Sequence, residues 1–303
     1  MHSPMTSRHP KSKQVTSSPA LPELLDRVSS LTALCVGDAI IDEYCYVRPL
    51  GKSPKEHIIA TQYTHRETFK GGVWAAAKHL EGFCAKVDIE LGFIVTTKRR
   101  FVEEETIRKL FEVHEASIEG LSLEQTKPSE YDLTVVADFG HGCISNALIA
   151  WICKEARFLA VNCQTNSANT GFNLITKYPR ADFVVVDELE ARLAMHDRQS
   201  PIEDVIRGLY GFGFRRIIVT LGSHGSVGYD ETGFYREPSV AKSVVDTMGA
   251  GDAFFSVTAP FAAAGASMRD LLRIGNAAGA IKCAVVGHRA SVDRKSLLAY
   301  LAS

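Results

Sequence analysis

Short apolar runs alternate with helical patterns along most of the chain. A continuous apolar run that ends at a small or acidic residue is typical of a strand buried on both faces of a parallel sheet. Such runs predict strands at residues 31–37, 133–137, 158–161, 183–186 and 217–221. Apolar residues at helical spacing predict helices at residues 21–29, 73–81, 146–156, 171–177, 188–195, 201–210, 250–264, 268–283 and 294–301. This order predicts an α/β fold with a mostly parallel central sheet that helices cover on both faces.

Several β-rich segments in the first part of the chain interrupt this alternation. They lie at residues 44–47, 57–63, 98–102 and 109–113. The first two surround a loop rich in Gly, Pro, Ser and Lys, and the last two are either further strands or a basic rim beside them. Because they break the order of strand and helix, we place them outside the main sheet, in a small β-lid near residues 43–66 and 96–115.

Composition limits the function classes without selecting one. The 303 residues, 46% of them hydrophobic, suffice for one large core, which we place at residues 21–303 after a disordered tail at residues 1–20. A formal net charge of −1 gives no argument for nucleic acid or membrane, and the longest apolar run, residues 253–266, is too short to span a bilayer. Seven cysteines without a C-x-x-C pair, and no signal-peptide pattern, indicate a cytoplasmic protein.

The strongest chemical signal is a glycine-rich turn between a β-branched pair and an apolar helix. Gly249 and Gly251 allow the backbone unusual conformations and a close approach by a ligand. The first N–H groups of the helix have no intrahelical acceptor, so they favour an anion such as phosphate. Asp252 in the first turn could accept a proton from a hydroxyl beside that anion. A tight turn with a capping aspartate is the alternative for a lone G-x-G.

The longer motif Asp-Thr-Met-Gly-Ala-Gly-Asp at residues 246–252 resembles the signature of the PfkB (ribokinase-like) carbohydrate kinases. The resemblance implies a three-layer ribokinase-like sandwich with a small β-lid, which transfers the γ-phosphoryl group of ATP to a sugar hydroxyl. It also implies that Asp252 is the catalytic base and that Gly249, Ala250 and Gly251 form the anion hole.

The resemblance assigns a sugar side to the early part of the chain. Asp42 matches an acid that accepts hydrogen bonds from sugar hydroxyls, and Gly71 and Gly72 match a pair that lets the backbone approach the sugar. Asp38 follows the first predicted strand and either contacts substrate or caps a loop. The family usually has an Asn three residues after the second Gly, but this chain has Ala75. An altered mode of sugar binding or a loss of activity follows from that departure.

Other motifs resemble the nucleotide side of the family. Asp187 and Glu190 match an Asn-x-x-Glu pattern that acts through water on Mg²⁺, although an acidic turn beside a helix dipole is the alternative. The residues expected to lie near the nucleotide are Thr220, Gly222, Gly225, Asp246, Thr247 and Asn276. A hairpin turn and close helix packing are the alternatives for the glycines and for Asn276. The resemblance leaves open a monovalent cation near Asp246 and residues 285–291.

A basic triplet at residues 98–100 suggests an anionic substrate. We expect Lys98 and Arg100 to clamp a phosphate already on the sugar, with a solvated face as the alternative. Asp-Phe-Gly-His-Gly at residues 138–142 and the pattern at residues 36–42 look most like the heptose 7-phosphate kinase branch, in which His141 could also face the site. Residues 162–166 end another strand and are expected to line the pocket.

The main hypothesis is a kinase that uses Mg-ATP on a sugar or sugar phosphate. A second hypothesis is a catalytically impaired nucleotide- or sugar-binding module, or a regulatory subunit, because Ala75 and Asp187 depart from the family pattern. A nucleoside kinase stays open as a third. By the resemblance we also expect a homodimer through the lid and a separate nucleotidyltransferase as a partner.

Overall fold

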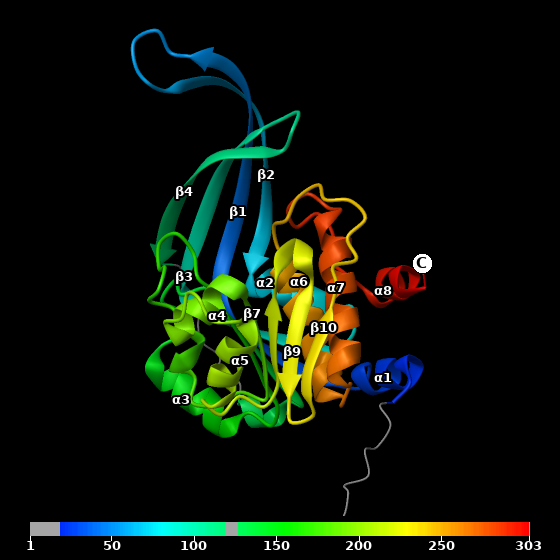
Figure 1. Cartoon of the computed structure of the whole chain (residues 1–303). Coiled ribbons are helices and arrows are strands. Elements are labelled where there is room, and N and C mark those ends of the chain that lie inside the picture. Colours follow the sequence, from blue (N-terminus) through cyan, green and yellow to red (C-terminus); the bar gives the residue numbers. More distant parts are fainter. Residues whose placement is uncertain (1–18, 119–126, 303) are drawn as a thin grey trace, which may run out of the picture.

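The computed structural model describes residues 19–118 and 127–302, which form three layers with one sheet in the middle (Figure 1). The predicted tail falls almost entirely on residues 1–18, outside the described part. The strands are β1 (Thr32–Lys52), β2 (Ile59–Gly72), β3 (Lys86–Glu103), β4 (Arg108–Ile118), β5 (Leu133–Asp138), β6 (Leu159–Cys163), β7 (Phe183–Asp187), β8 (Ile217–Thr220), β9 (Ser226–Asp230) and β10 (Gly233–Glu237). Their order is β10-β9-β8-β7-β6-β5-β1-β3-β4, and β2 pairs with β1.

The centre of the sheet is parallel, as predicted. Strands β3, β1, β5, β6, β7 and β8 run in one direction, whereas β2, β4, β9 and β10 pair antiparallel with their neighbours. The helices are α1 (Leu21–Val28), α2 (Val73–Leu80), α3 (Asn146–Glu155), α4 (Glu188–Met195), α5 (Ile202–Tyr210), α6 (Ala250–Ala263), α7 (Met268–Cys283) and α8 (Arg294–Leu301). The predicted α/β class with a mostly parallel sheet is therefore confirmed.

Each face of the sheet has its own core because successive side chains of a strand point to opposite faces. In β1, Ala33 and Cys35 pack in the core beneath α1, α2, α6, α7 and α8, whereas Leu34 and Val36 pack in the core beneath α3, α4 and α5. All four side chains are buried. The carboxyl ends of the parallel strands therefore meet at one edge between two helical layers, where open α/β sheets bind ligands.

The prediction that the β-rich segments lie outside the main sheet is wrong. β1 is one strand of 21 residues, and β3 one of 18, so each passes from the body of the protein into the projecting part without a break (Figure 1). A register shift between Gly37 and Ala39, where β1 pairs with β3, lets the ladder continue past an irregularity that would otherwise end it. We call the strand residues within 43–66 and 96–115 the outer sheet.

Two smaller differences concern helices. The helix predicted at residues 171–177 is a series of turns with a 3-10 helix only at Ile175–Lys177. Gly171 has a φ of +80°, and the side chain of Asn173 donates to the carbonyl oxygens of Asp138 and Gln164, which holds the segment as a loop. Among residues 19–118 and 127–302, the helices are all too short or too polar to cross a membrane.

Candidate active site

A cavity of about 310 Å³ opens where the parallel strands end and α6 begins. Two groups of predicted residues meet in it. Its lining includes Asp42, Gly72, Lys98, Arg100, Asn162, Gln164, Asp187, Glu190, Thr220, Thr247, Gly249, Gly251 and Asp252. These residues come from distant parts of the chain, so the fold brings the two glycine motifs, the basic strand and the acidic turn to one space. We call the group from residues 42–100 the sugar side and the group from residues 162–252 the phosphoryl side.

The phosphoryl side is built around the start of α6. Gly249 is its N-cap and has a φ of +73°, in the left-handed region that favours glycine. The next N–H groups, of Gly251 and Asp252, belong to the first turn and have no acceptor within the helix. A side chain at Gly251 would meet nothing within 4 Å, so that position faces open space. Ala250 does not line the cavity, and its N–H donates to the carbonyl of Thr247 at 3.2 Å.

Asp252 is half-buried at the floor of the cavity and is oriented by an amide chain. The amide of Gln164 donates to the Asp252 carboxylate and, at 2.7 Å, to the side-chain oxygen of Asn162. Asn162 in turn donates to the carbonyl of Val185 at 2.8 Å. Burial raises the pKa of Asp252, although the charge of His288 and the Gln164 amide oppose it. This carboxyl is therefore a better proton acceptor than an ordinary aspartate.

Asp187 and Glu190 form a capping box at the start of α4 and also line the cavity. The N–H of Glu190 donates to Asp187 at 2.7 Å, and the N–H of Asp187 donates to Glu190 at 2.8 Å. The second oxygen of Glu190 accepts from the N–H of Thr165 at 2.9 Å. Burial, reinforced by the charge of Asp187, raises the pKa of Glu190. The acidic turn thus caps α4, and it also presents two carboxyl groups to the cavity.

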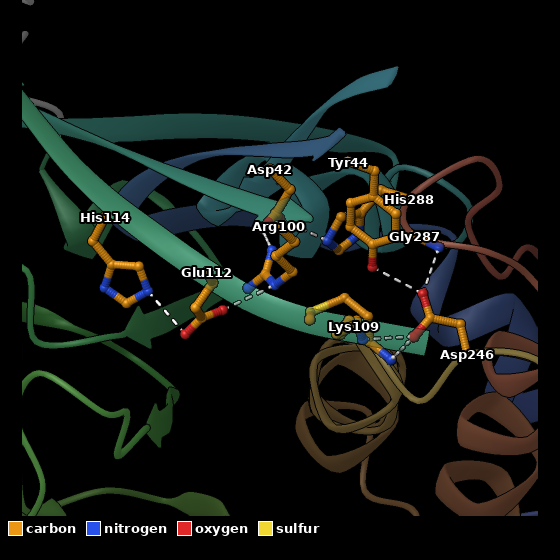
Figure 2. A network of polar contacts seen from close by, with 10 residues as sticks. Asp42, Tyr44, Arg100, Lys109, Glu112, His114, Asp246, Gly287 and His288 are labelled. Carbon is orange, nitrogen blue, oxygen red and sulfur yellow. Dashed lines mark hydrogen bonds and ion pairs between the residues drawn. The ribbon is translucent and has the colours of Figure 1, made fainter. Parts of the chain in front are cut away.

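The sugar side is a set of charged side chains that bind one another (Figure 2). The carboxylate of Asp42 accepts a hydrogen bond from Arg100 and lies 3.2 Å from Nε2 of His288. Burial raises the pKa of Asp42, but His288 and Arg100 outweigh it and lower the pKa below its ordinary value. Gly71 is required beside this group because a Cβ there would lie 2.1 Å from Oδ2 of Asp42. Asp42 is therefore ionised and largely engaged.

The basic triplet is split by the alternation of β3. Lys98 and Arg100 are buried and point into the cavity, with Nζ of Lys98 at 5.8 Å from the centre of the Phe139 ring. Arg99 points to the other face, where it binds Glu43 at 2.6 Å and Glu115 at 2.9 Å. Burial lowers the pKa of Lys98. Two buried cationic groups beside an engaged carboxylate favour an anionic ligand.

Ala75, where the family pattern has Asn, is buried and lines a second cavity of about 350 Å³. Lys70, Lys78 and Arg289 also line that cavity. His288 belongs to both linings and so separates the two spaces. The methyl group at position 75 therefore belongs to the second cavity, and the polar side chain that lines both cavities is His288.

Several predicted residues do not line the cavity. Asp38 is fully buried, and its carboxylate accepts from the N–H groups of Phe139 at 2.7 Å and Cys143 at 3.2 Å, which is the loop-cap alternative. Asn276 donates to the carbonyls of Glu237 at 3.2 Å and Pro238 at 3.1 Å and lines a separate cavity of about 260 Å³.

Three further residues of the predicted nucleotide set lie near the cavity but outside its lining. A Cβ at Gly225 would lie 2.1 Å from the carbonyl oxygen of Glu237, so its role is in the hairpin turn. Gly222 has a φ of +58° and open space around it. Asp246 is buried beside the glycine turn and is bound by Lys109, Tyr44 and the backbone (Figure 2).

His288 is the main residue that the sequence analysis missed. It lies in the loop after α7, and a Cβ at Gly249 would lie 3.0 Å from its Cε1, so it touches both sides of the cavity. A single histidine between a glycine and an arginine in a loop has no periodicity or spacing that marks it. Only the three-dimensional fold brings it to Asp42.

Comparison with known proteins shows the family to which this chain is similar. Residues 143–295, half of the chain, match the family described as pfkB family carbohydrate kinase. A protein named bifunctional protein HldE from Desulfatibacillum aliphaticivorans is 26% identical over 90% of this chain and 63% of its own length. A D-beta-D-heptose 7-phosphate kinase from Bordetella bronchiseptica is 22% identical over 86% of this chain and 94% of its own length. The chain thus spans about three fifths of the HldE relatives that it matches.

Solved structures share the fold at lower identity. A ribokinase from Thermotoga maritima superposes with a TM-score of 0.70 at 17% identity and covers 90% of this chain and 100% of its own. Phosphofructokinase-2 from Escherichia coli, in complex with potassium, superposes with a TM-score of 0.70 at 15% identity over 91% of this chain and 100% of its own. The predicted ribokinase-like fold is confirmed by these structures.

Proposed function

The chain belongs to the pfkB family of carbohydrate kinases, and from this premise we propose that it transfers the γ-phosphoryl group of ATP to a hydroxyl of a sugar phosphate similar to heptose 7-phosphate. The observation that carries the proposal is the position of Asp252. Its carboxylate shares one cavity with the glycine turn on one side and with Lys98 and Arg100 on the other. A base, an anion-binding helix start and a cationic wall are the parts that this reaction needs.

In the proposed reaction, Asp252 accepts the proton of the attacking hydroxyl. Gln164 holds the carboxylate in place, and burial raises its pKa, so proton transfer is favoured when a hydroxyl lies within reach. The free N–H groups at Gly251 and Asp252 and the helix dipole stabilise the charge on the transferring phosphoryl group. We extend the anion hole to Asp252 and leave out the N–H of Ala250, which is engaged with Thr247.

The acidic pair fits the magnesium ion that accompanies ATP. Asp187 and Glu190 offer oxygen atoms to the cavity, and a cation there would offset both the burial and the charge of Asp187 that raise the pKa of Glu190. In the described part of the chain there is no cluster of three or more His, Cys, Asp or Glu side chains that could hold a metal. Mg²⁺ keeps several waters and binds nucleotide phosphates, so two carboxylates suffice. The ion supplies charge neutralisation at those phosphates.

We assign the substrate's own phosphate to the sugar side. Asp42 is already bound by Arg100 and His288, so it has little capacity left for sugar hydroxyls. The same arrangement leaves the ammonium group of Lys98 directed at the cavity. This balance favours a phosphorylated sugar over a neutral one, and over a nucleoside, in agreement with the name of the relative from Bordetella.

The outer sheet is proposed to act as the lid, and its exposed apolar side chains support a homodimer through it. Ile59, Tyr63 and Phe111 are exposed by 55% or more. Relatives of the HldE type are named bifunctional, and we propose a separate nucleotidyltransferase as the enzyme that uses the product. For the monovalent cation that the resemblance leaves open, the contacts of Asp246 argue against a bound ion, although phosphofructokinase-2 is described in complex with potassium.

A substrate panel tests the proposal. ADP release is measured with Mg-ATP and with heptose 7-phosphate, fructose phosphates, ribose and a nucleoside, beside calorimetric titration of each compound. We expect turnover with a phosphorylated sugar and little with ribose or the nucleoside. Nucleotide binding without turnover of any compound would instead support the binding module, which the family match does not favour.

A further inference from the structure

The carboxylate of Asp246, beside the glycine turn, has its hydrogen-bonding capacity filled by the protein (Figure 2). Oδ1 accepts from Nζ of Lys109 at 2.9 Å and from the N–H of Met248 at 3.0 Å. Oδ2 accepts from the hydroxyl of Tyr44 at 2.9 Å and from the N–H of Gly287 at 2.9 Å. An ionised carboxylate offers about four lone-pair sites, and four donors take them. Asp246 therefore has no oxygen site left for a bound ion.

In the loop that follows α7, a backbone carbonyl group is already bound by a second ammonium group. Lys282, in the last turn of α7, is 1% exposed, and its Nζ donates to the carbonyl oxygen of Gly287. Its Cε lies 3.3 Å from the place that a Cβ of Gly249 would occupy. The charge of Lys282 is thus buried directly beneath the start of the glycine turn. Backbone carbonyls are oxygen ligands for a cation, and an ammonium group already present repels another positive charge.

We propose that the ammonium groups of Lys109 and Lys282 are the resident cations of this loop, so that the protein binds nucleotide and transfers phosphoryl groups without a bound monovalent cation. The inference rests on the proposed kinase function, but nucleotide binding tests it independently of turnover. The sequence left open a monovalent cation near Asp246 and residues 285–291. The hydrogen-bond donors and the positive charges there do not fit such an ion.

Each lysine has a distinct positioning role. Lys282 places positive charge behind the N-terminus of α6, where it adds to the helix dipole that faces the transferring phosphoryl group. Lys109 comes from β4 in the outer sheet and reaches Asp246, which lies three residues before Gly249. The ion pair therefore ties the outer sheet to the loop that shapes the anion hole, a connection that a free ion in solution would not provide.

The experiment compares cations in a buffer whose only bulk cation is tetramethylammonium, which is too large for the loop. Binding of Mg²⁺ with a non-hydrolysable ATP analogue is measured by calorimetry, with and without about 100 mM potassium at constant ionic strength. The melting temperature and, with an accepted substrate, the rate of ADP release are measured in the same pairs of buffers. The proteins are wild type, Lys282→Ala, Lys109→Met and Lys154→Ala. Lys154 is the matched control because its side chain is 81% exposed on α3.

For wild type and Lys154→Ala we expect potassium to change the dissociation constant by less than about twofold. Lys282→Ala should bind the analogue about tenfold more weakly in tetramethylammonium and regain affinity with potassium or methylammonium, which fit the space left by the side chain. Lys109→Met, which frees one site on Asp246, should also become dependent on potassium.

A wild type whose nucleotide affinity or rate rises about fivefold or more with potassium would overturn the proposal. So would a folded Lys282→Ala protein that matches wild type in tetramethylammonium. If Lys282→Ala does not fold, the potassium dependence of nucleotide binding by Lys109→Met and by the wild type still tests the proposal. If nucleotide binds but no sugar is turned over in any buffer, the proposed function fails while the binding comparison still tests this inference.

Discussion

The two sides of the cavity are built from different kinds of group. The phosphoryl side depends on backbone N–H groups at the start of α6 and on carboxylates oriented by backbone and amide donors. The sugar side depends on charged side chains that neutralise one another, with Asp42 between Arg100 and His288. A group that the backbone holds in place keeps its position as long as the fold is kept. A pair of side chains, in contrast, can be replaced by substitution without a change in the backbone.

This difference bears on which motifs of the family persist in the chain, although Asp187 on the phosphoryl side also departs from the pattern. The glycine turn and Asp252 keep the family pattern, because a change there would alter the backbone of the helix start. On the sugar side Ala75 replaces an amide, and His288 stands before it. Substrate choice is therefore expected to reside in the side chains of the sugar side, and catalytic capacity in the backbone of the helix start and the carboxylate of Asp252. Four predictions sharpen that comparison, in order of decreasing effect.

Replacing the base should have the largest effect. Asp252→Asn removes the proton acceptor but keeps the size and the contact with Gln164, so we expect kcat to fall by about 10³-fold. Calorimetry should show that Mg-ATP binding changes little. Asp204→Asn, at an exposed position in the first turn of α5, is the matched control and should retain full activity. Equal rates for the Asp252 variant and wild type would remove Asp252 from the mechanism.

Replacing a glycine by alanine should affect the free energy of unfolding differently on the two sides of the cavity. Gly71→Ala places a Cβ 2.1 Å from Oδ2 of Asp42, which Arg100 and His288 hold, so we expect a loss of about 3 kcal/mol in the free energy of unfolding. Gly251→Ala meets nothing within 4 Å and should change that free energy by less than about 1 kcal/mol while lowering activity. Denaturant titration measures both, and similar losses would contradict the division.

Asp246 should make stability depend on pH in the acid range. Burial raises its pKa, but the bonds from Gly287, Lys109 and Met248 outweigh burial and lower the pKa from 3.8 to about 2. A depressed pKa contributes stability above the ordinary value, which is lost as the pH falls from about 4 to 2. The stability difference between wild type and Asp246→Asn should therefore shrink by about 2 kcal/mol over that window.

The free energy of unfolding of both proteins, measured at a series of acid pH values, tests this effect. The same comparison in proteins that also carry Lys109→Met supplies the control. Lys109 is one of the groups that lower the pKa of Asp246, so the pH-dependent part should be smaller without it. A stability difference that stays constant from pH 5 to 2, within about 0.5 kcal/mol, would show that Asp246 is not held as an ion.

The smallest effect is expected for one cation of the sugar side. Lys98→Met should raise the KM for a phosphorylated sugar by about tenfold, because one charge-assisted contact is lost, and should leave the KM for ATP nearly unchanged. Arg99→Met is the matched control, since Arg99 points to the other face of β3. Equal effects of the two variants on KM would place the substrate's phosphate elsewhere.

Much of the fold could be predicted because local and global signals agree. The helix limits at residues 268–283 and 294–301 match α7 and α8, where Ser267 and Asp293 cap the first turns. The outer sheet could not be predicted in the same way. The apolar run that begins β1 ends at Gly37 and Asp38, and such a change in composition normally marks the end of a strand. Here it marks only the point where the strand leaves the two helical layers.

The candidate site was predictable where chemistry is local in sequence. Gly249, Gly251 and Asp252 lie together in the chain and in the cavity, as do Asp187 and Glu190. Asp38 and His288 show the limit: the sequence left open whether the first contacts substrate or caps a loop, and it caps the loop after β5, whereas the second had no signal although it touches Asp42. Both outcomes depend on which loops the sheet order brings together, and a single sequence does not contain that information in a readable form.

The continuity of β1 and β3 determines how the outer sheet can move. A flap on a flexible linker swings freely, but here β1 and β3 are paired from Thr32 and Lys86 to Val47 and Glu103, with one register shift between Gly37 and Ala39. Displacement must therefore occur by elastic bending and twisting of paired strands, with the irregular steps at Tyr46/Val47 and Phe101/Val102 as the compliant points. Motion of this kind is graded and self-restoring, so the resting position of the outer sheet is set by its own stiffness.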